Sequence, residues 1–123
     1  MTKINAVASS FLLCYTVRMG RTVCYGGFEW DEDKARENLK KHGVSFEDAA
    51  QAFFDPHFFD VLDEEHSTAN EKRYVGYGVV HGVLVVATVF TERERVRIIS
   101  ARRATKKERM GYYGRANYYA NGN

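Results

Sequence analysis

The segment that decides the fold is VLVVATVFTERERVRIISARR, residues 83–103. Its first part, residues 83–90, is almost entirely apolar, which predicts a central strand that is buried on both faces. The charged residues 91–95 predict a hairpin loop, and residues 96–101 predict a strand that returns beside the first. The segment therefore predicts an antiparallel pair of strands at the centre of a sheet.

Two further strands are predicted just before this pair. Residues 73–79 alternate between two faces, and residues 58–62 are aromatic and β-branched, which is typical of strands. An acidic, polar stretch, residues 63–70, is expected to be the loop between them. Because the connections are short, we expect three or four consecutive strands to form an antiparallel meander.

Capping signals predict a helix upstream of the strands. Asp31 is a suitable N-cap for a helix that runs to about His42 and ends at Gly43 in the left-handed conformation. Carboxylates in its first turn and cations in its last turn both suit the helix dipole. Its apolar stripe is thin and consists of Ala35 and Leu39, which we expect to face the core.

A second helix is predicted from Ser45, which begins a near capping box. Apolar side chains recur at i, i+3, i+4 and i+7 along one face of this segment. They are Phe46, Ala49, Ala50 and Phe53. The pair Asp55-Pro56 is expected to end the helix, because the residue before a proline disfavours the helical conformation.

A last helix is predicted from Thr105, which forms a full capping box with Glu108. Gly111 and Gly114 weigh against its continuation, so residues 116–123 are predicted to be a polar tail. The order of elements therefore predicts an α+β protein, with an antiparallel meander sheet packed on one side by helices.

The N-terminal residues 1–27 are expected to be an extension that precedes the domain. Residues 6–17 are apolar and follow Lys3, which loosely resembles a signal peptide. No Ala-x-Ala cleavage site follows, and Met19 offers an internal start, so we expect residues 1–18 to be an upstream extension. Residues 20–27 are expected to be a short strand or a loop.

Composition limits the class of protein. The 123 residues are 45% hydrophobic and 28% charged, which is typical of one globular domain. No apolar run reaches the roughly 20 residues of a membrane-spanning helix. The two cysteines, Cys14 and Cys24, lack the spacing of a disulfide framework or a zinc site, so a cytoplasmic location is expected.

The net charge of +2 hides an asymmetry along the chain. Residues 29–71 contain thirteen acidic and four basic side chains, whereas residues 92–123 contain nine basic and three acidic ones. A basic C-terminal third is able to bind a polyanion such as nucleic acid. The alternative is a solvated face whose charge is partly cancelled by the acidic half.

The motifs of several enzyme classes are missing from the sequence. It contains no GxxxxGKS/T loop, no GxGxxG after a strand, no HExxH and no GxSxG. The four histidines lack metal-ligand spacing; they are His42, His57, His66 and His81. We therefore expect neither a metal site nor a cofactor.

Cationic side chains are the remaining candidates for chemistry. Strict alternation along residues 96–103 predicts that Arg102 shares a face with Ile98, and that Arg103 shares the other face with Arg97. Further cations are expected to reach the same edge of the sheet: Arg73, Lys41 and His42.

A cluster of guanidinium groups suits the cleavage of an RNA phosphodiester. The 2′-hydroxyl attacks the adjacent phosphate, and arginines stabilise the dianion that develops. A base and an acid are also needed, and the candidates are His42, Glu92, Glu108 and Tyr112. Each has a structural alternative: His42 complements a helix C-terminus, Glu108 completes a capping box, Glu92 lies in a solvated hairpin, and Tyr112 is a core or stacking aromatic.

Together these segments resemble the BrnT family of bacterial type II toxins. The resemblance extends from about Phe28 to Tyr113, and its most specific parts are KHGVSF, residues 41–46, and RIISARRAT, residues 97–105. Its other parts are Phe28–Asp31, Asn38–Lys40, the acidic loop with His66, Arg73 and Thr91–Arg93. On this basis residues 28–115 are expected to be the toxin domain.

The resemblance implies a small RelE-like fold and a metal-independent ribonuclease that blocks translation. It also implies a BrnA-type antitoxin, which is a ribbon-helix-helix-like DNA-binding protein, and contact with operator DNA only as the toxin–antitoxin complex. The residues carried over to the active site are Lys41, Arg73, Arg102 and Arg103. Glu92 and Tyr112 join them from the argument on proton transfer. The expected RNA-binding residues are Lys40, His42, Arg97, Lys106 and Lys107.

Two other functions are compatible with the same sequence. One is a nucleic-acid-binding module that uses the basic edge without cleaving RNA. The other is a degenerate toxin that only titrates an antitoxin.

Overall fold

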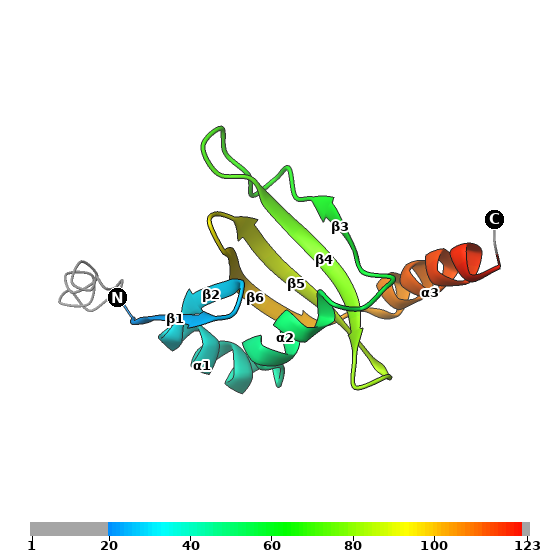
Figure 1. Ribbon diagram of the computed structural model, residues 1–123, viewed down its shortest axis with the longest axis horizontal. Coiled ribbons are helices and arrows are strands. Elements are labelled where there is room, and N and C mark those ends of the chain that lie inside the picture. The colour runs from blue at the N-terminus through cyan, green and yellow to red at the C-terminus, as the bar shows by residue number, and fades with distance from the viewer. Residues whose placement is uncertain (1–19, 122–123) are drawn as a thin grey trace.

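The structure is a computed structural model that describes residues 20–121, so the expectation for residues 1–18 lies outside the described residues. Figure 1 shows the arrangement of its helices and strands. In chain order the elements are β1 (Thr22–Tyr25), β2 (Phe28–Asp31), α1 (Glu32–His42), α2 (Phe46–Ala52), β3 (Phe59–Leu62), β4 (Arg73–Val80), β5 (Leu84–Glu92), β6 (Val96–Arg103) and α3 (Lys106–Ala120).

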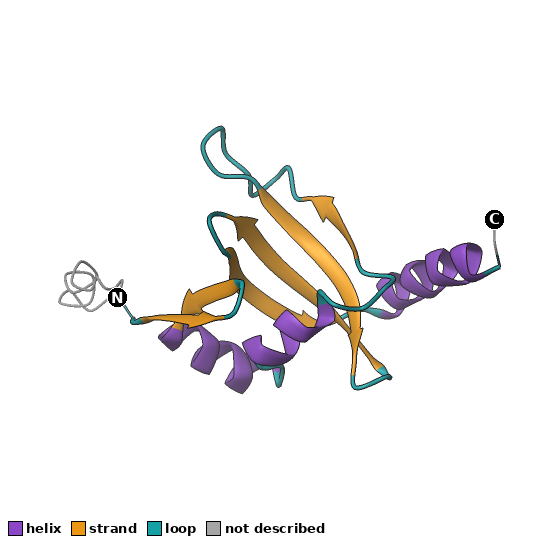
Figure 2. Ribbon diagram, viewed as in Figure 1, coloured by secondary structure: helices purple, strands orange, loops and turns teal. Residues whose placement is uncertain are grey.

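The strands of residues 20–121 form one sheet in the order β1-β2-β6-β5-β4-β3 (Figure 2). The predicted α+β class is confirmed, and β3 to β6 form the predicted antiparallel meander. Two features were not predicted. The strand β2 pairs with β6 in the parallel direction, and β1 pairs with β2 so that Tyr25 lies opposite Phe28. The expected domain start at residue 28 therefore falls inside this hairpin.

Helices α1 and α2 pack together on one face of the sheet, which we call the helix face (Figure 1). Within residues 20–121, the opposite face, which we call the open face, is covered only at one end, where Tyr112 and Ala116 of α3 pack in one cluster with Val85. Most of the core lies under α1 and α2. Its buried members are Phe28, Trp30, Val44, Phe46, Ala49, Ala50, Ala52, Val80, Val86, Ile98 and Ala101.

Helix α1 follows its predicted caps but not its predicted stripe. Asp31 accepts a hydrogen bond from the Lys34 backbone N–H at 2.9 Å, and Gly43 adopts the left-handed conformation with φ 70°. Leu39, however, is 50% exposed, and Asn38 is the buried residue of the helix. The predicted apolar stripe was wrong at Leu39 because the helix turns a hydrogen-bonding side chain toward the sheet.

Asn38 forms hydrogen bonds with the backbone of β6 beyond the point where β2 stops pairing with it. Its amide group donates to the Ala101 carbonyl at 2.8 Å and accepts from the Ala101 N–H at 3.1 Å. It also donates to the Val44 carbonyl at 3.0 Å. All of these atoms are buried, where an unpaired polar group would be costly. One side chain therefore fixes α1 against the strand that carries Arg102.

Helix α2 approaches the sheet closely enough to require glycine. A Cβ atom at Gly78 of β4 would lie 2.3 Å from the Ala52 carbonyl oxygen. The helix ends at Ala52, with Phe53 as its C-cap, which is earlier than the predicted Asp55-Pro56 stop. Phe53 instead packs its ring on Phe58 and Phe90.

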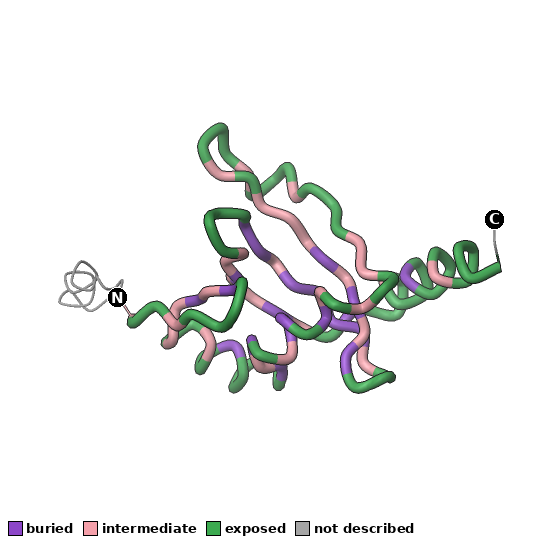
Figure 3. Tube along the Cα trace, viewed as in Figure 1, coloured by how far each residue is buried: buried purple, intermediate pink, exposed green. Residues whose placement is uncertain are grey.

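Helix α3 begins at the predicted capping box of Thr105 and Glu108. It then continues through both glycines to Ala120, so the predicted tail was wrong for the residues up to that point. Figure 3 shows that the second half of the helix is largely exposed. The buried residue of the helix is Tyr112. The hydroxyl group of Tyr112 donates a hydrogen bond to the Asp55 carboxylate, which attaches the helix to the sheet.

Candidate functional site

A β-bulge in β6 decides which arginines share a face. The register passes from Val89 opposite Ser100 to Phe90 opposite Ile98, so Ile99 is an extra residue in β6. A bulge of this kind reverses the alternation of side chains beyond it. The predicted faces were therefore wrong, since strict alternation does not hold across the extra residue.

The pairing with β5 gives the faces directly. Arg102 lies opposite Ala87 on the open face, which it shares with Arg97 opposite Thr91. Arg103 lies opposite the core residue Val86, on the helix face. The open face thus holds two separate charged clusters, one at each end of β6.

The first group, which we call the hairpin cluster, lies beside the β5–β6 turn. Its members are Glu29, Glu71, Arg73, Arg93 and Arg97. Arg97 donates to Glu29 at 2.9 Å, and both side chains are largely buried. Arg93 bridges the two carboxylates, at 3.1 Å from Glu71 and 3.9 Å from Glu29. Arg73 completes the chain with a 3.3 Å contact to Glu71, so three guanidinium groups surround two carboxylates.

The second group, which we call the α3 cluster, lies where β6 meets the start of α3. Its members are Tyr77, Arg102 and Glu108. Arg102 forms a bidentate pair with Glu108, with N–O distances of 2.8 Å and 3.1 Å. The Tyr77 hydroxyl donates to the same carboxylate at 3.0 Å, and so does the Thr105 backbone N–H at 2.8 Å. Glu108 therefore joins the cap of α3 to the arginine of β6.

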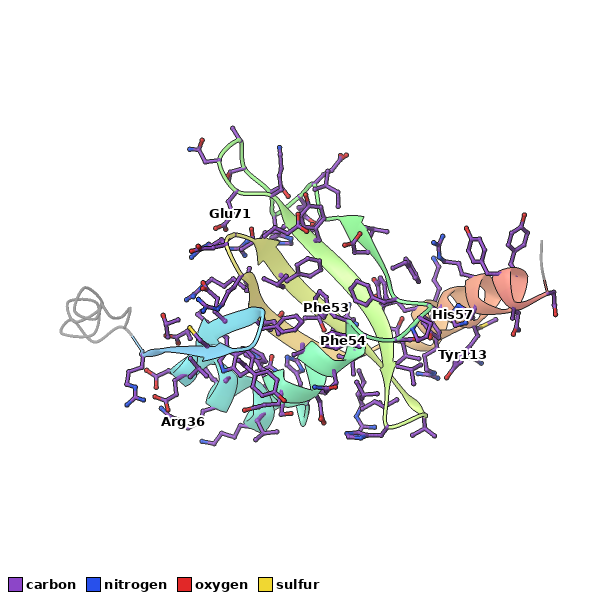
Figure 4. The ribbon with its side chains drawn as sticks, viewed as in Figure 1. Arg36, Phe53, Phe54, His57, Glu71 and Tyr113 are labelled. Carbon is purple, nitrogen blue, oxygen red and sulfur yellow. The ribbon has the colours of Figure 1, made fainter. Side chains whose placement is uncertain are left out.

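The two clusters lie about 15 Å apart along β6, at the usual rise per strand residue. In Figure 4, Glu71 lies at the hairpin end of the sheet, and Tyr113 marks α3 at the opposite end. The expectation that Arg73 reaches the edge of Arg102 was therefore wrong. Its partner across β5 is Arg97, because Arg73 and Arg97 both lie opposite Thr91.

The pKa shifts follow from these contacts. The Arg102 hydrogen bonds are the largest cause that lowers the pKa of Glu108, to about 2, and the same pair raises the pKa of Arg102. The Arg93 hydrogen bond lowers the pKa of Glu71. Burial raises the pKa of Tyr77, and the bond to Glu108 adds to that rise.

None of these shifts brings a pKa closer to pH 7, where a general base or acid works best. Glu108 is thus a poor base. Its contacts fit the structural role that the sequence also allowed, which is completion of the α3 capping box. Among residues 20–121, no three His, Cys, Asp or Glu side chains are grouped so as to hold a metal ion. Within the same range, no helix is long and apolar enough to cross a bilayer.

Comparison with known proteins gives this arrangement a family. A family model described as “Ribonuclease toxin, BrnT, of type II toxin-antitoxin system” matches residues 30–108. The chain belongs to the BrnT family. A similar solved structure is the crystal structure of the Brucella abortus ribonuclease toxin BrnT, which is 28% identical. The match covers 63% of this chain and 94% of that chain, with a TM-score of 0.47. No curated protein matches the chain.

Membership of the BrnT family makes RNA the substrate class and an antitoxin the expected partner. The residues matched by the family model, 30–108, include every member of the two clusters except Glu29. They also include Lys41 and His42, which lie in the exposed last turn of α1, together with Lys40. These three cations lie on the helix that packs on the helix face, and Arg103 lies on the same face of β6, whereas Arg102 lies on the open face.

The remaining predicted residues lie in different surroundings. Glu92 is exposed at the end of β5 and lines a shallow cavity that Glu71 and Arg93 also line. Tyr112 is 3% exposed, and burial together with the Asp55 carboxylate raises the pKa of its phenol. Lys106 and Lys107 are exposed in the first turn of α3, next to the Arg102–Glu108 pair.

Sequence reasoning did not identify four residues of the two clusters as site residues. Glu29, Glu71 and Arg93 belong to the hairpin cluster, and Tyr77 belongs to the α3 cluster. The only sequence signal for Tyr77 was its place on an alternating strand, which does not identify a partner. The pairing of Glu29 with Arg97 depends on the parallel contact between β2 and β6, which sequence patterns do not reveal.

Proposed function

We propose that this BrnT-family chain is an endoribonuclease that cleaves RNA without a metal ion, by attack of a ribose 2′-hydroxyl on the adjacent phosphate. The observation that carries the proposal is that Arg73, Arg97 and Arg102 all lie on the open face of one sheet, in the two clusters. A surface lined with guanidinium groups suits a phosphodiester, because each group offers paired donors to phosphate oxygens.

The scissile phosphate is proposed to bind at the α3 cluster. The side chain of Arg102 is 42% exposed, so its guanidinium group meets solvent while Glu108 fixes its orientation. A preorganised donor of this kind stabilises a developing dianion without reorganising during the reaction. The Tyr77 hydroxyl donates to the same carboxylate, and this bond helps to hold Glu108 against Arg102.

The hairpin cluster is proposed to hold a neighbouring part of the RNA. Its three arginines outnumber its two carboxylates, so it keeps a net positive charge. The side chain of Arg93 is 50% exposed and is the most accessible of the three arginines. RNA that spans both clusters would follow the open face of β6.

The biological role that we propose follows the family. Cleavage of messenger RNA would inhibit translation in the cytoplasm, and a BrnA-type antitoxin would neutralise the toxin by covering it. Contact with operator DNA is proposed only for the toxin–antitoxin complex. The register favours Arg102 as the active-site arginine, because Arg103 lies on the helix face. Lys41 and Glu92 remain proposed active-site residues.

The test is incubation of the purified protein with RNA in the presence of EDTA. We expect fragments that end in a 2′,3′-cyclic phosphate, detected by mass spectrometry, because attack by the 2′-hydroxyl leaves that group. RNA that is cut only after magnesium is restored would contradict the metal-independent mechanism. Growth arrest on induction, relieved by co-expression of a BrnA-type antitoxin, would support the cellular role.

One observation favours a second candidate function, a binding module that does not cleave. Glu108 already occupies two donors of Arg102, which leaves fewer for a substrate phosphate. RNA that is bound with a steep salt dependence, and that stays intact, would support this alternative.

A further inference from the structure

The second half of α3 encloses a cavity with the loop between α2 and β3. The residues that line it are Pro56, His57, Phe58, Arg115, Ala116 and Tyr119. Figure 4 places His57 on that loop, beside the ribbon of α3. The cavity therefore joins an arginine, a histidine and two aromatic rings, and none of these residues belongs to the two arginine clusters of the open face.

Arg115 is the charged centre of this cavity. Its guanidinium carbon lies 4.3 Å from the centre of the Phe59 ring and 5.9 Å from that of Tyr119. Within the described residues 20–121, no carboxylate lies in ion-pair contact with it, unlike Arg102 or Arg97. A guanidinium group that is held on aromatic faces, and keeps its charge, is suited to a phosphate or a nucleobase.

A chain of contacts links Arg115 to the α3 cluster through Phe59, over whose ring Arg115 lies. The rings of Phe59 and Tyr77 lie 5.2 Å apart, and the Tyr77 hydroxyl binds the carboxylate that holds Arg102. Along α3, Glu108 and Arg115 are about 10 Å apart at the helical rise per residue. A single RNA strand covers that distance within a few nucleotides, so one strand is able to reach both arginines.

The surrounding charge favours an anion. The carboxylate of Asp55 lies in the same loop, but its oxygens already accept from the Tyr112 hydroxyl and from the backbone N–H groups of His57 and Val79. Helix α3 carries four basic side chains and one acidic one. The Asp55 carboxylate is therefore already occupied by other donors and does not act as an ion-pair partner for Arg115.

We propose that this cavity is a second nucleotide-binding subsite, which holds the RNA strand a few nucleotides from the scissile phosphate. Arg115 binds a backbone phosphate, and the exposed ring of Tyr119 stacks on a base. The inference rests on the proposed ribonuclease function, because the same strand must pass Arg102.

The test compares the binding of a short and a longer RNA. Fluorescence anisotropy is measured with 2′-O-methyl RNA of three and of eight nucleotides, which lacks the attacking hydroxyl and stays intact. We expect the wild-type chain to bind the octanucleotide more tightly than the trinucleotide. Arg115→Gln should weaken octanucleotide binding by about tenfold, within the range measured for loss of one base-stacking or phosphate contact, and should leave trinucleotide binding nearly unchanged.

Arg36→Gln is the matched control, since it removes the same charge from an exposed arginine on α1. The subsite is overturned if both variants weaken binding equally, if Arg115→Gln affects both lengths alike, or if the wild-type chain binds neither RNA. It is also overturned if Arg115→Gln weakens capture of the antitoxin but leaves RNA binding intact, since the cavity would then be a protein-docking site. The proposed ribonuclease function is tested separately by the cleavage assay with EDTA, in which RNA that stays intact would contradict it.

Discussion

The two faces of the sheet differ in what they bury. The helix face packs Val86, Phe90 and Ile98 under α1 and α2, and its buried amide Asn38 has its hydrogen bonds satisfied. The open face carries the two charged clusters, and among the described residues only its α3 end is covered. The strand β6 contributes side chains to both faces, and the bulge at Ile99 places Arg102 on the open face and Arg103 on the helix face.

This difference suggests a division of roles, in which the helix face stabilises the fold and the open face binds and cleaves RNA. Substitutions on the helix face should cost folding free energy, because they leave cavities or unpaired buried groups. Substitutions on the open face should cost RNA binding and cleavage with less effect on folding. The predictions below test this division in order of decreasing expected effect on stability.

Asn38→Ala should have the largest effect. It leaves the N–H and the carbonyl of Ala101 and the carbonyl of Val44 without their partner in a buried environment. We expect the free energy of unfolding in urea to fall by about 2–4 kcal/mol. Glu37→Ala, on the exposed side of the same helix, is the control and should change it by less than about 0.5 kcal/mol. Equal losses would contradict the role of Asn38.

Val86→Ala and Val89→Ala compare the two faces within one strand. Val86 is 0% exposed beneath the helices, whereas Val89 lies on the open face and is half-buried. We expect losses of about 2–3 kcal/mol for Val86→Ala and below about 1 kcal/mol for Val89→Ala, from chemical denaturation. A larger loss for Val89→Ala would mean that the open face is also packed.

Glu108→Gln tests the α3 cluster through its pH dependence. The pKa of Glu108 is lowered from its usual value to about 2, so its ionised form stabilises the folded state. That contribution is complete above pH 4.5, and it is lost as the pH falls toward 2. Glu108→Gln should cost about 1–2 kcal/mol at pH 7, allowing for the exposure of Arg102, and almost nothing near pH 2. A pH-independent difference would contradict the pairing.

Tyr112→Phe tests whether that residue is an anchor. It removes the hydroxyl group that donates to Asp55, and we expect a loss of about 1–2 kcal/mol in the free energy of unfolding. Tyr113→Phe is the control, because the neighbouring Tyr113 is 43% exposed, and we expect no measurable loss. Cleavage of RNA per folded molecule should be unchanged in both variants. A specific loss of cleavage in Tyr112→Phe would restore the catalytic role expected from the sequence.

Local signals predicted much of the fold. The caps at Asp31, Ser45 and Thr105 lie within a few residues of what they stabilise, so the starts of all three helices were predictable. The buried position of Asn38 was not, because its partners lie on β6, 63 residues away in sequence. The parallel contact of β2 with β6 was missed for the same reason.

The candidate site was predictable in residue type but not in geometry. The arginines of β6 were identified from the sequence, but their faces depend on one extra residue in the pairing with β5. Arg73 was expected near Arg102 because both lie on neighbouring parts of the sheet. The register instead places it beside Arg97, since register is set by long-range pairing rather than by local pattern.

The most direct test of the open face is the rate of RNA cleavage by Arg102→Lys and Arg103→Lys, measured in EDTA on protein shown to be folded. Both variants keep the charge and lose the paired donors of the guanidinium group. The account predicts a loss of about 100-fold or more for Arg102→Lys and only a few-fold for Arg103→Lys. An equal loss in both variants, or a larger loss in Arg103→Lys, would contradict the assignment of RNA cleavage to the open face.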